Sequence, residues 1–457
     1  CSLATAALVI LGVTSPADGP DARVQSLGGL HVLTEDASNV FSNPSLVGAH
    51  SNRVFFSLGL SGNGTSLGLE PHGGGFVTFK DTFTLGVVLN RSPESYGFGR
   101  ALWPVALAYL PDGPGGDLVG PDGPVETTAP LRFPADLFLG FGNVDSPFRF
   151  GVNLYYAGGS DREWAVSDAN EDDLEDSTII RKQTHLFSAT LGVSGGSAAD
   201  RLRPEGWVRV SHLSAWHDQL SDIETEPGVT EPISDYILSI DRDLRVGGGF
   251  RMHIGDRSEG VVFTPGVEYD AAFGTFRFDD NLRSPDGGAE LASRAVMAHD
   301  ARAGLGIACR KDGLMVQATA SVTFRDLQVV DEVEAGEDEV DRTTSDTIDL
   351  AIPEISIGAE YRVLPVLFLR AGLRSAVVGG KQVGTARLAT GDDGSPYEYE
   401  VVQTVQPTDV TVTVAGTAGF GLEVRRMKLD ALFGGVFLGE GSDPAFFSRI
   451  DLGFNFK

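Results

Sequence analysis

Two short glycine–serine motifs are the first candidates for a site of covalent catalysis. The stretches GTSLG (Gly64–Gly68) and GVSGGS (Gly192–Ser197) both contain the G-x-S-x-G pattern that holds the nucleophile of many serine hydrolases. Such a nucleophile needs a sharp turn from a strand into a helix, and no helical pattern follows either motif. Because the chain has 58 glycines, matches of this kind arise by chance. We therefore predict that the protein is not an enzyme.

Acidic runs and histidines raise the question of a metal site. The run SDANEDDLED (Ser167–Asp176) places Asp168, Asn170 and Asp172 as a calcium-binding loop would. It lacks the glycine at the sixth position and the acidic ligand at the twelfth. The eight histidines show no repeated ligand spacing. We predict neither a metal nor another cofactor, and we interpret the acidic runs as solvated loops that could hold divalent cations only loosely.

A third set of candidates consists of arginines at alternate positions of extended segments. On such a segment they share a face, and that face could guide charge or bind the carboxylate of an amphipathic ligand. The alternative is a network of ion pairs that stiffens the protein, which we favour because buried charges must be paired. The arginines that we expect to face a common interior are Arg209, Arg251, Arg302, Arg370 and Arg374.

The elements that would position these residues are long strands. From Val410 to Arg425 the even positions are mostly large and apolar, whereas the odd positions are small or polar. The segment Leu314–Arg325 repeats this alternation. A period of two indicates a strand with one apolar face, and these strands are about as long as a tilted strand needs to cross a bilayer. Strands of a soluble sandwich are usually shorter.

The connections between the strands alternate in length, as in barrels of the bacterial outer membrane. Tight connections include Arg310–Gly313 and Arg425–Lys428. The long connections are polar and acidic, and we expect them in loops at Ser92–Pro134, Gly158–Lys182, Ala215–Asp241, Gly274–His299, Leu327–Ser345 and Val377–Thr408. We predict an all-β fold, a transmembrane antiparallel β-barrel of 14–16 strands over residues 53–457. In one strand the apolar phase switches at Pro353, which predicts a bulge there.

Composition limits the class of partner. The chain has 457 residues, 35 Lys and Arg against 63 Asp and Glu, and a formal net charge of −28. Nucleic acid is therefore excluded as a partner, because phosphate binding needs clustered positive charge.

The opening residues CSLATAALVILGVTSPADG resemble a secretory signal peptide, which we assign to residues 1–17. An acylated Cys1 is the alternative, and either one takes the protein out of the cytoplasm.

The last strand ends in aromatic residues. In FFSRIDLGFNFK the side chains of Ile450, Leu452, Phe454 and Phe456 share one face. Outer-membrane barrels commonly close with such a strand, which the barrel-insertion machinery recognises. We therefore expect that machinery and outer-membrane lipid as partners, and integral insertion in the bacterial outer membrane.

The stretch EDASNVFSNPSLVG followed by NRVFFSLGLS resembles the N-terminal region of the FadL-type transporters of long-chain fatty acids. The matching residues are Asp36, Ala37, Asn39, Asn43 and Pro44, with Ser45 in place of the usual alanine. The stretch beginning at Leu27 also resembles the related PorV-like barrels. The resemblance is specific over about residues 27–60, and it implies a barrel of fourteen strands.

In the FadL-type family this segment is a hatch that plugs the barrel from inside. The resemblance therefore implies a hatch over residues 18–52, with Asp36, Asn39, Asn43, Pro44 and Ser45 as gating residues. The composition agrees, because the segment is too apolar for a disordered tail, and a barrel of this size encloses space that side chains alone cannot fill. The alternative is that Asn43-Pro44 only forms a turn before the first strand.

Two functions follow from these expectations. The first is passage of hydrophobic small molecules, such as long-chain fatty acids or hydrocarbons, through a plugged barrel. The second is a PorV-like role in anchoring or shuttling secreted or surface proteins. An open porin would leave the hatch unexplained. We prefer the transporter.

Overall fold

The structure is a computed structural model of the whole chain. It describes residues 22–23, 27, 37–50, 52–63, 66–80, 82–91, 119–120, 123–124, 132–143, 145–167, 176–197, 199–226, 229–256, 260–279, 290–334, 342–390, 398–407, 410–438 and 445–456. No helix among these residues is long and apolar enough to span a membrane.

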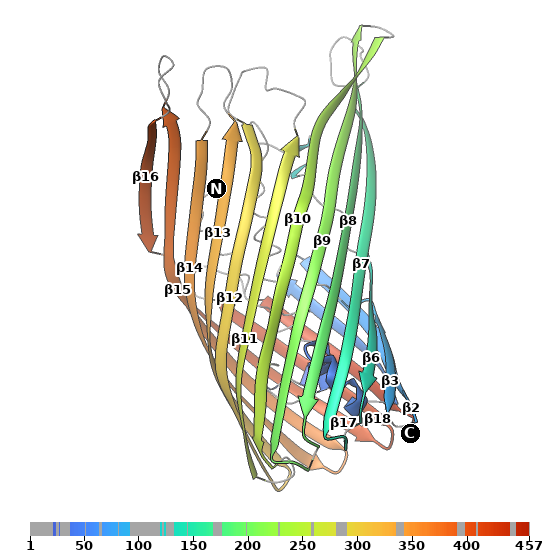
Figure 1. The fold of residues 1–457 in the computed structure, drawn as a ribbon. Helices are drawn as coiled ribbons and strands as arrows, with labels where there is room; N and C mark the ends of the chain where they lie inside the picture. The colour runs from blue at the N-terminus through green and yellow to red at the C-terminus, as the bar shows by residue number, and fades with distance from the viewer. Residues whose placement is uncertain are drawn as a thin grey trace.

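The chain forms a closed antiparallel barrel of sixteen strands (Figure 1). Each strand pairs with the next along the chain, and the ring closes between β1 and β19, where Arg53 pairs with Asn455. The predicted fold class is confirmed. The wall consists of β1 (Arg53–Asn63), β2 (Ser66–Phe79), β3 (Phe83–Leu89), β6 (Arg132–Phe141), β7 (Phe148–Ser167), β8 (Asp176–Gly195), β9 (Leu202–Glu226), β10 (Val229–Gly255), β11 (Gly260–Asp279), β12 (Glu290–Lys311), β13 (Leu314–Glu334), β14 (Arg342–Leu364), β15 (Leu367–Thr390), β17 (Thr411–Val424), β18 (Met427–Leu438) and β19 (Ala445–Asn455).

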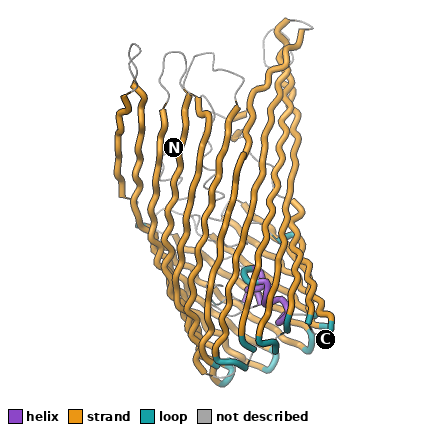
Figure 2. Tube along the Cα trace, in the orientation of Figure 1, coloured by secondary structure: helices purple, strands orange, loops and turns teal. Residues whose placement is uncertain are grey.

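The remaining elements are short. Strands β4 (Val119–Gly120) and β5 (Gly123–Pro124) pair only with each other, and β16 (Glu398–Pro407) pairs along the upper part of β15. Two 3₁₀ helices, η2 (Ala37–Phe41) and η3 (Pro44–His50), lie inside the barrel close to its lower rim (Figure 2). They precede β1 and bring the N-terminal segment against the wall.

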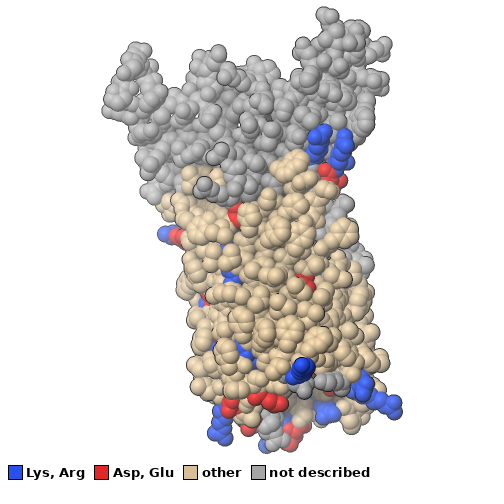
Figure 3. All heavy atoms as spheres, turned by 45° about the vertical axis from the view of Figure 1, so that its right-hand side comes forward, with Lys and Arg blue, Asp and Glu red and all other residues tan. Residues whose placement is uncertain are grey.

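The outer face of the barrel is apolar, as the alternation predicts. Val412 is 47% exposed and Leu369 is 49% exposed, whereas their inward neighbours Ala415 and Arg370 are buried. Figure 3 shows a broad band with few charged side chains, and charges gathered at the lower rim. An exposed apolar band around a closed barrel places that band in a membrane, because lipid is the medium that such a surface fits.

The two ends of the barrel differ. At the lower end, which we call the turn end, strands are joined by short turns at residues 80–82, 312–313, 365–366 and 425–426. Asp312 and Gly313 both have positive φ, 49° and 80°, as a tight hairpin turn requires. The tight connections predicted at Arg310–Gly313 and Arg425–Lys428 are confirmed. The opposite end, where the long connections lie, is called the loop end.

Several segments expected as loops at the loop end are strands instead. The predicted loop Ala215–Asp241 is mostly taken up by β9 and β10, which continue to Glu226 and from Val229. The predicted loop Val377–Thr408 contains the second half of β15 and all of β16. These segments are polar because they rise above the membrane band, so polarity there does not indicate a loop.

The bulge expected at Pro353 is absent. Strand β14 keeps one continuous register with β13 through Val322–Pro353, and no shift interrupts it. Pro353 and Ile355 face outwards, whereas Leu350 and Glu354 on the alternate positions are buried inside. The apparent phase switch arises because the inner face, not the outer face, is apolar above this point.

Candidate functional site: the barrel lumen

The N-terminal segment before β1, for which we predict the role of a hatch and which we call the hatch segment, contacts the wall through the Asn43-Pro44 turn. Backbone N–H groups of Ser42 and Asn43 donate to the Asn39 carbonyl, and the Asn43 side chain donates to the Val193 carbonyl on β8 at 3.3 Å. Its Oδ1 accepts from the Ser45 hydroxyl at 2.7 Å and from the Ser45 amide at 3.2 Å. The turn thereby satisfies its own polar groups while it is buried.

The same turn is tied to the wall by a short chain of side chains. The hydroxyl oxygens of Ser45 and Ser194 on β8 lie 3.0 Å apart in a hydrogen bond, and Arg149 Nε on β7 donates to Ser194 Oγ at 2.9 Å. Ser45 and Ser194 are each 1% exposed. Ser194 belongs to the second G-x-S-x-G motif, yet β8 runs from it into a turn and not into a helix. Ser194 instead contacts the hatch segment.

A row of three wall glycines makes room for this contact. Gly140, Gly151 and Gly192 are register partners on β6, β7 and β8. A Cβ on Gly151 would overlap the Pro44 carbonyl, and a Cβ on Gly192 would overlap the Asn43 side chain. The hatch backbone therefore lies directly on the wall, and only glycine permits that approach.

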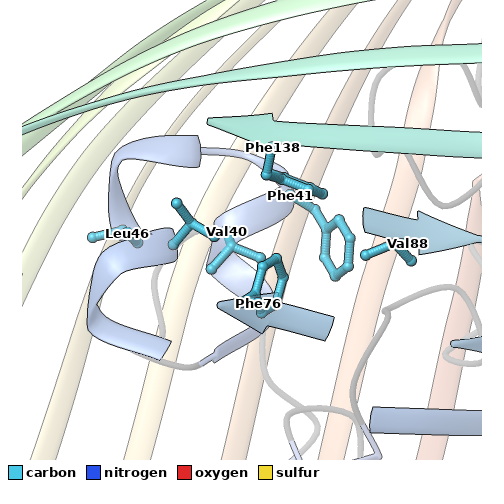
Figure 4. Packing of buried hydrophobic residues seen from close by; sticks show 7 residues of the cluster. Val40, Phe41, Leu46, Phe76, Val88 and Phe138 are labelled. Carbon is cyan, nitrogen blue, oxygen red and sulfur yellow. The ribbon is translucent and has the colours of Figure 1, made fainter. Parts of the chain in front are cut away.

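Apolar side chains complete the contact on the neighbouring strands. Phe41 and Phe138 pack edge to face with ring centroids 5.7 Å apart, and Phe138 packs in the same way against Phe76 at 5.6 Å. Figure 4 shows Phe41 directed towards Phe138, with Val88 nearby. The hatch contributes the first four members of this buried cluster and the wall the others: Val40, Phe41, Leu46, Val47, Phe76, Val88 and Phe138. Aromatic pairs of this geometry stabilise beyond simple area burial.

Arg91 links the cluster to the polar wall. Its guanidinium lies 4.4 Å from the Phe41 ring centroid and pairs with Asp136 through Nη2 at 2.6 Å. Asn153 donates to the same carboxylate at 2.9 Å. Both ionic side chains are fully buried, so their pairing is necessary for burial to be tolerated.

Of the predicted gating residues, Asn39, Asn43, Pro44 and Ser45 are buried in this contact, and Asp36 lies outside the described residues. The segment also reaches the far side of the lumen. The Ala22 amide donates to Asp451 at 2.5 Å, and Arg23 pairs with Glu360 at 2.9 Å.

The five arginines named from the sequence lie on inward positions of four strands: β9, β10, β12 and β15. Arg251 donates to Glu205 through Nε at 2.8 Å and Nη2 at 2.6 Å. Arg370 bridges two carboxylates, Glu360 and Asp430, each at 2.6 Å. Arg302 and Arg374 share Glu354. Arg209 is buried on β9. Carboxylates thus neutralise much of this face, as the network interpretation expects.

Above these ion pairs the inner wall changes character. Ala298, Leu327 and Val329 point inwards and are at most 5% exposed, and Leu350 lies beside them at 7%. On the outer face of the same strands, Asp326 is exposed. At this level of β12–β14 the inner face therefore carries apolar side chains, whereas the outer face carries an exposed acid.

Sequence reasoning missed the wall side of the site. Ser194 appeared only as a chance motif, and the glycine row was not noticed, because its members are about 10 and 40 residues apart and meet only through strand pairing. The available indication was glycine on the inward phase of three successive strands. Among the described residues no cluster of His, Cys, Asp or Glu could hold a metal ion.

No protein-family description and no curated protein matches the chain. Similar solved structures include the Pseudomonas putida toluene transporter TodX, with 10% identity, a TM-score of 0.39, and coverage of 95% of this chain and 97% of TodX. The CymD monoaromatic hydrocarbon channel is 14% identical, with a TM-score of 0.37 and coverage of 95% and 97%. The ferric-catecholate import receptor Fiu from E. coli K12 is 9% identical, with a TM-score of 0.34 and coverage of 88% and 82%.

Proposed function

We propose that the protein is a channel of the bacterial outer membrane that passes hydrophobic small molecules, such as long-chain fatty acids or hydrocarbons, through a plugged barrel. Outer-membrane lipid surrounds the apolar band, and the aromatic-tipped β19 is the segment that the barrel-insertion machinery would recognise. The loop end faces the cell exterior in this proposal, because long connections lie outside in such barrels.

The apolar inner face carries this proposal. A water-filled pore has a polar lumen, whereas here Ala298, Leu327, Val329 and Leu350 place apolar side chains on the inner face of β12–β14. Such a surface favours apolar solutes over hydrated ions, because contact removes apolar area from water. The ion pairs below it then form the floor of the apolar section.

The inner face gives a direct test. Leu327→Gln together with Val329→Gln should lower the uptake of a hydrophobic fluorescent probe into proteoliposomes at least fivefold, roughly the effect of losing 1 kcal/mol or more of apolar contact. The matched control is Val330→Gln, an outward residue of the same strand. Equal uptake in the inner variant, the control and the unchanged protein would contradict the proposal.

The hatch is the second part of the proposal: residues 18–52 close the aqueous path. Deleting them should leave the barrel able to fold, since each strand keeps its neighbours' hydrogen bonds. Planar-bilayer conductance should be small for the full protein and clearly larger for the deletion. Replacing Asn43 and Pro44 by alanine should give intermediate, flickering conductance. A deletion that folds and inserts but conducts no more than the parent would show that the segment is not a plug.

A further inference from the structure

A group of hydrogen-bond donors lies on the outer wall, away from the lumen. Tyr156 on β7 and His185 on β8 stack with ring centroids 6.2 Å apart, and Tyr156 Oη lies 3.1 Å from His185 Nδ1. Tyr156 is 40% exposed and packs on Phe187, whose centroid is 4.9 Å away. Below this pair the outer face is apolar, with Leu191 and Val208 both exposed.

Above the pair the same face becomes basic. Arg162 on β7 and Arg181 on β8 are register partners on the outward phase. Between them and His185, Trp216 Nε1 donates to Gln183 Oε1 at 3.1 Å. Like charges placed opposite each other on neighbouring strands repel and destabilise a sheet. Such a pair is favourable where an anion lies between the two guanidinium groups.

The acids around this pair leave an excess of positive charge. Among the described residues no carboxylate forms an ion pair with either guanidinium; Asp161 accepts only the backbone N–H of Arg162, at 3.0 Å. Asp218 is the register partner of Arg181 on β9. The row of Arg162, Arg181 and Asp218 therefore carries two positive charges and one negative charge, a net charge of +1.

A second pair of the same construction occurs on β11 and β12. Tyr269 Oη lies 2.8 Å from His299 Nδ1, and the rings stack at 6.1 Å. Here the register partner of the histidine on β13 is the exposed acid Asp326. The two places thus share a Tyr–His pair but differ in the charge beside it.

Both pairs lie at the same height in the membrane. From β8 to β13, successive register partners lie further and further from the turn end. Ser194, beside the turn end of β8, is connected through five strand pairs to Ser321, well inside β13. The row of Tyr156 reaches Phe273 on β11, and Tyr269 lies four residues below Phe273. The rise of the register rows from β7 to β11 is therefore offset by the lower position of Tyr269 on β11. The two pairs therefore stand at a similar height on the outer wall.

We propose that the outer face of β7–β9 binds the phosphorylated headgroup of a lipid in the leaflet at the loop end. Arg162 and Arg181 hold the phosphate, because guanidinium forks match phosphate oxygens in geometry and charge. Tyr156 and His185 contact the rest of the headgroup, and the acyl chains lie along Phe187, Leu191 and Val208. This binding concerns the outer wall and does not depend on what passes through the lumen.

The test uses the full barrel in detergent, with diphosphoryl lipid A as the probe and the same lipid without phosphates as its control. The thermal midpoint of the protein should rise with the phosphorylated lipid only. Arg162→Gln with Arg181→Gln should weaken binding roughly tenfold or more, as expected for losing charge-assisted hydrogen bonds. Without lipid this variant should be at least as stable as the parent, because the repulsion between the arginines is gone.

The matched control is Tyr269→Phe with His299→Gln, at the place that carries Asp326. It should keep affinity for the phosphorylated lipid within about twofold, since lost neutral hydrogen bonds contribute little where no phosphate is held. Single Arg162→Gln and Arg181→Gln variants, each with intermediate affinity, guard against misfolding of the double variant. Equal midpoint shifts with both lipids, or a loss in the control as large as in the arginine variant, would overturn the proposal.

Discussion

The space inside the barrel is filled in different ways along two parts of the inner wall. On β3, β6, β7 and β8, which we call the hatch wall, glycines and apolar residues let η3 lie directly on the sheet. On β9–β15, the charged wall, long ionic side chains fill the space and pair with one another, as Arg251 does with Glu205. A lumen of this width can therefore be filled by a segment of chain or by side-chain networks, and small wall residues mark where the chain lies.

The largest effect should come from breaking a buried pair of the charged wall. Arg251→Met removes the guanidinium that pairs with Glu205, which is 3% exposed, and leaves His253 Nε2 at 3.4 Å from its carboxylate. We expect a loss of about 3–5 kcal/mol in the free energy of unfolding, because a buried charge loses its partner. Reversible unfolding in micelles measures it. Arg251→Lys keeps the charge and should lose clearly less; equal losses would mean that the pairing is unimportant.

The next largest effect should come from the outer face, which is apolar on the strands of the hatch wall and of the charged wall alike. Val412→Arg and Leu369→Arg place a charge in lipid and should each cost about 2–4 kcal/mol near the midplane. Thr413→Arg points inwards and should be far milder. The same unfolding assay compares them. Three equal losses would contradict the assignment of inner and outer faces.

Filling the glycine row should affect the hatch wall alone. Gly151→Leu places a side chain where the Pro44 carbonyl lies, and overpacking of this kind typically costs about 1–3 kcal/mol. We also expect raised conductance in planar bilayers, because the hatch can no longer lie on the wall. Gly416→Ala, where a Cβ meets only the Leu373 side chain at 3.9 Å, is the control. Unchanged conductance with Gly151→Leu would show that the glycine row is not needed for the hatch to close the barrel.

The smallest effect should come from the serine contact. Ser194→Ala removes the hydroxyl that joins Ser45 to Arg149, and a single hydrogen bond of this kind contributes about 0.5–1.5 kcal/mol. Ser188→Ala, which removes the partner of Ser211 higher on the same strand, is the control. The two variants should lose similar stability, but only Ser194→Ala should increase brief openings in bilayers. Identical conductance traces for the two variants would show that Ser194 does not help to hold the hatch on the wall.

The strands of the membrane band were readable because lipid imposes one rule on the whole outer face. Alternation in Val410–Arg425 and Leu314–Arg325 predicts the faces that the structure shows, and the tight turn at Asp312 follows from its residue types. Above the band that rule ends. The upper parts of β9, β10 and β15 contain many polar residues, so a pattern based on an apolar outer face assigned these segments to loops.

The barrel, the inward phase of its strands and the polar turn chemistry of Asn43-Pro44 can be read from the sequence, because each depends on residues close together in the chain. Which residues meet across the lumen depends on the tertiary structure. Gly140, Gly151 and Gly192 become one row through strand register, Arg370 reaches Asp430 across three strands, and Leu327 with Val329 becomes apolar lining because the wall rises beyond the membrane. Register depends on how sixteen strands close into a ring, which no local pattern contains.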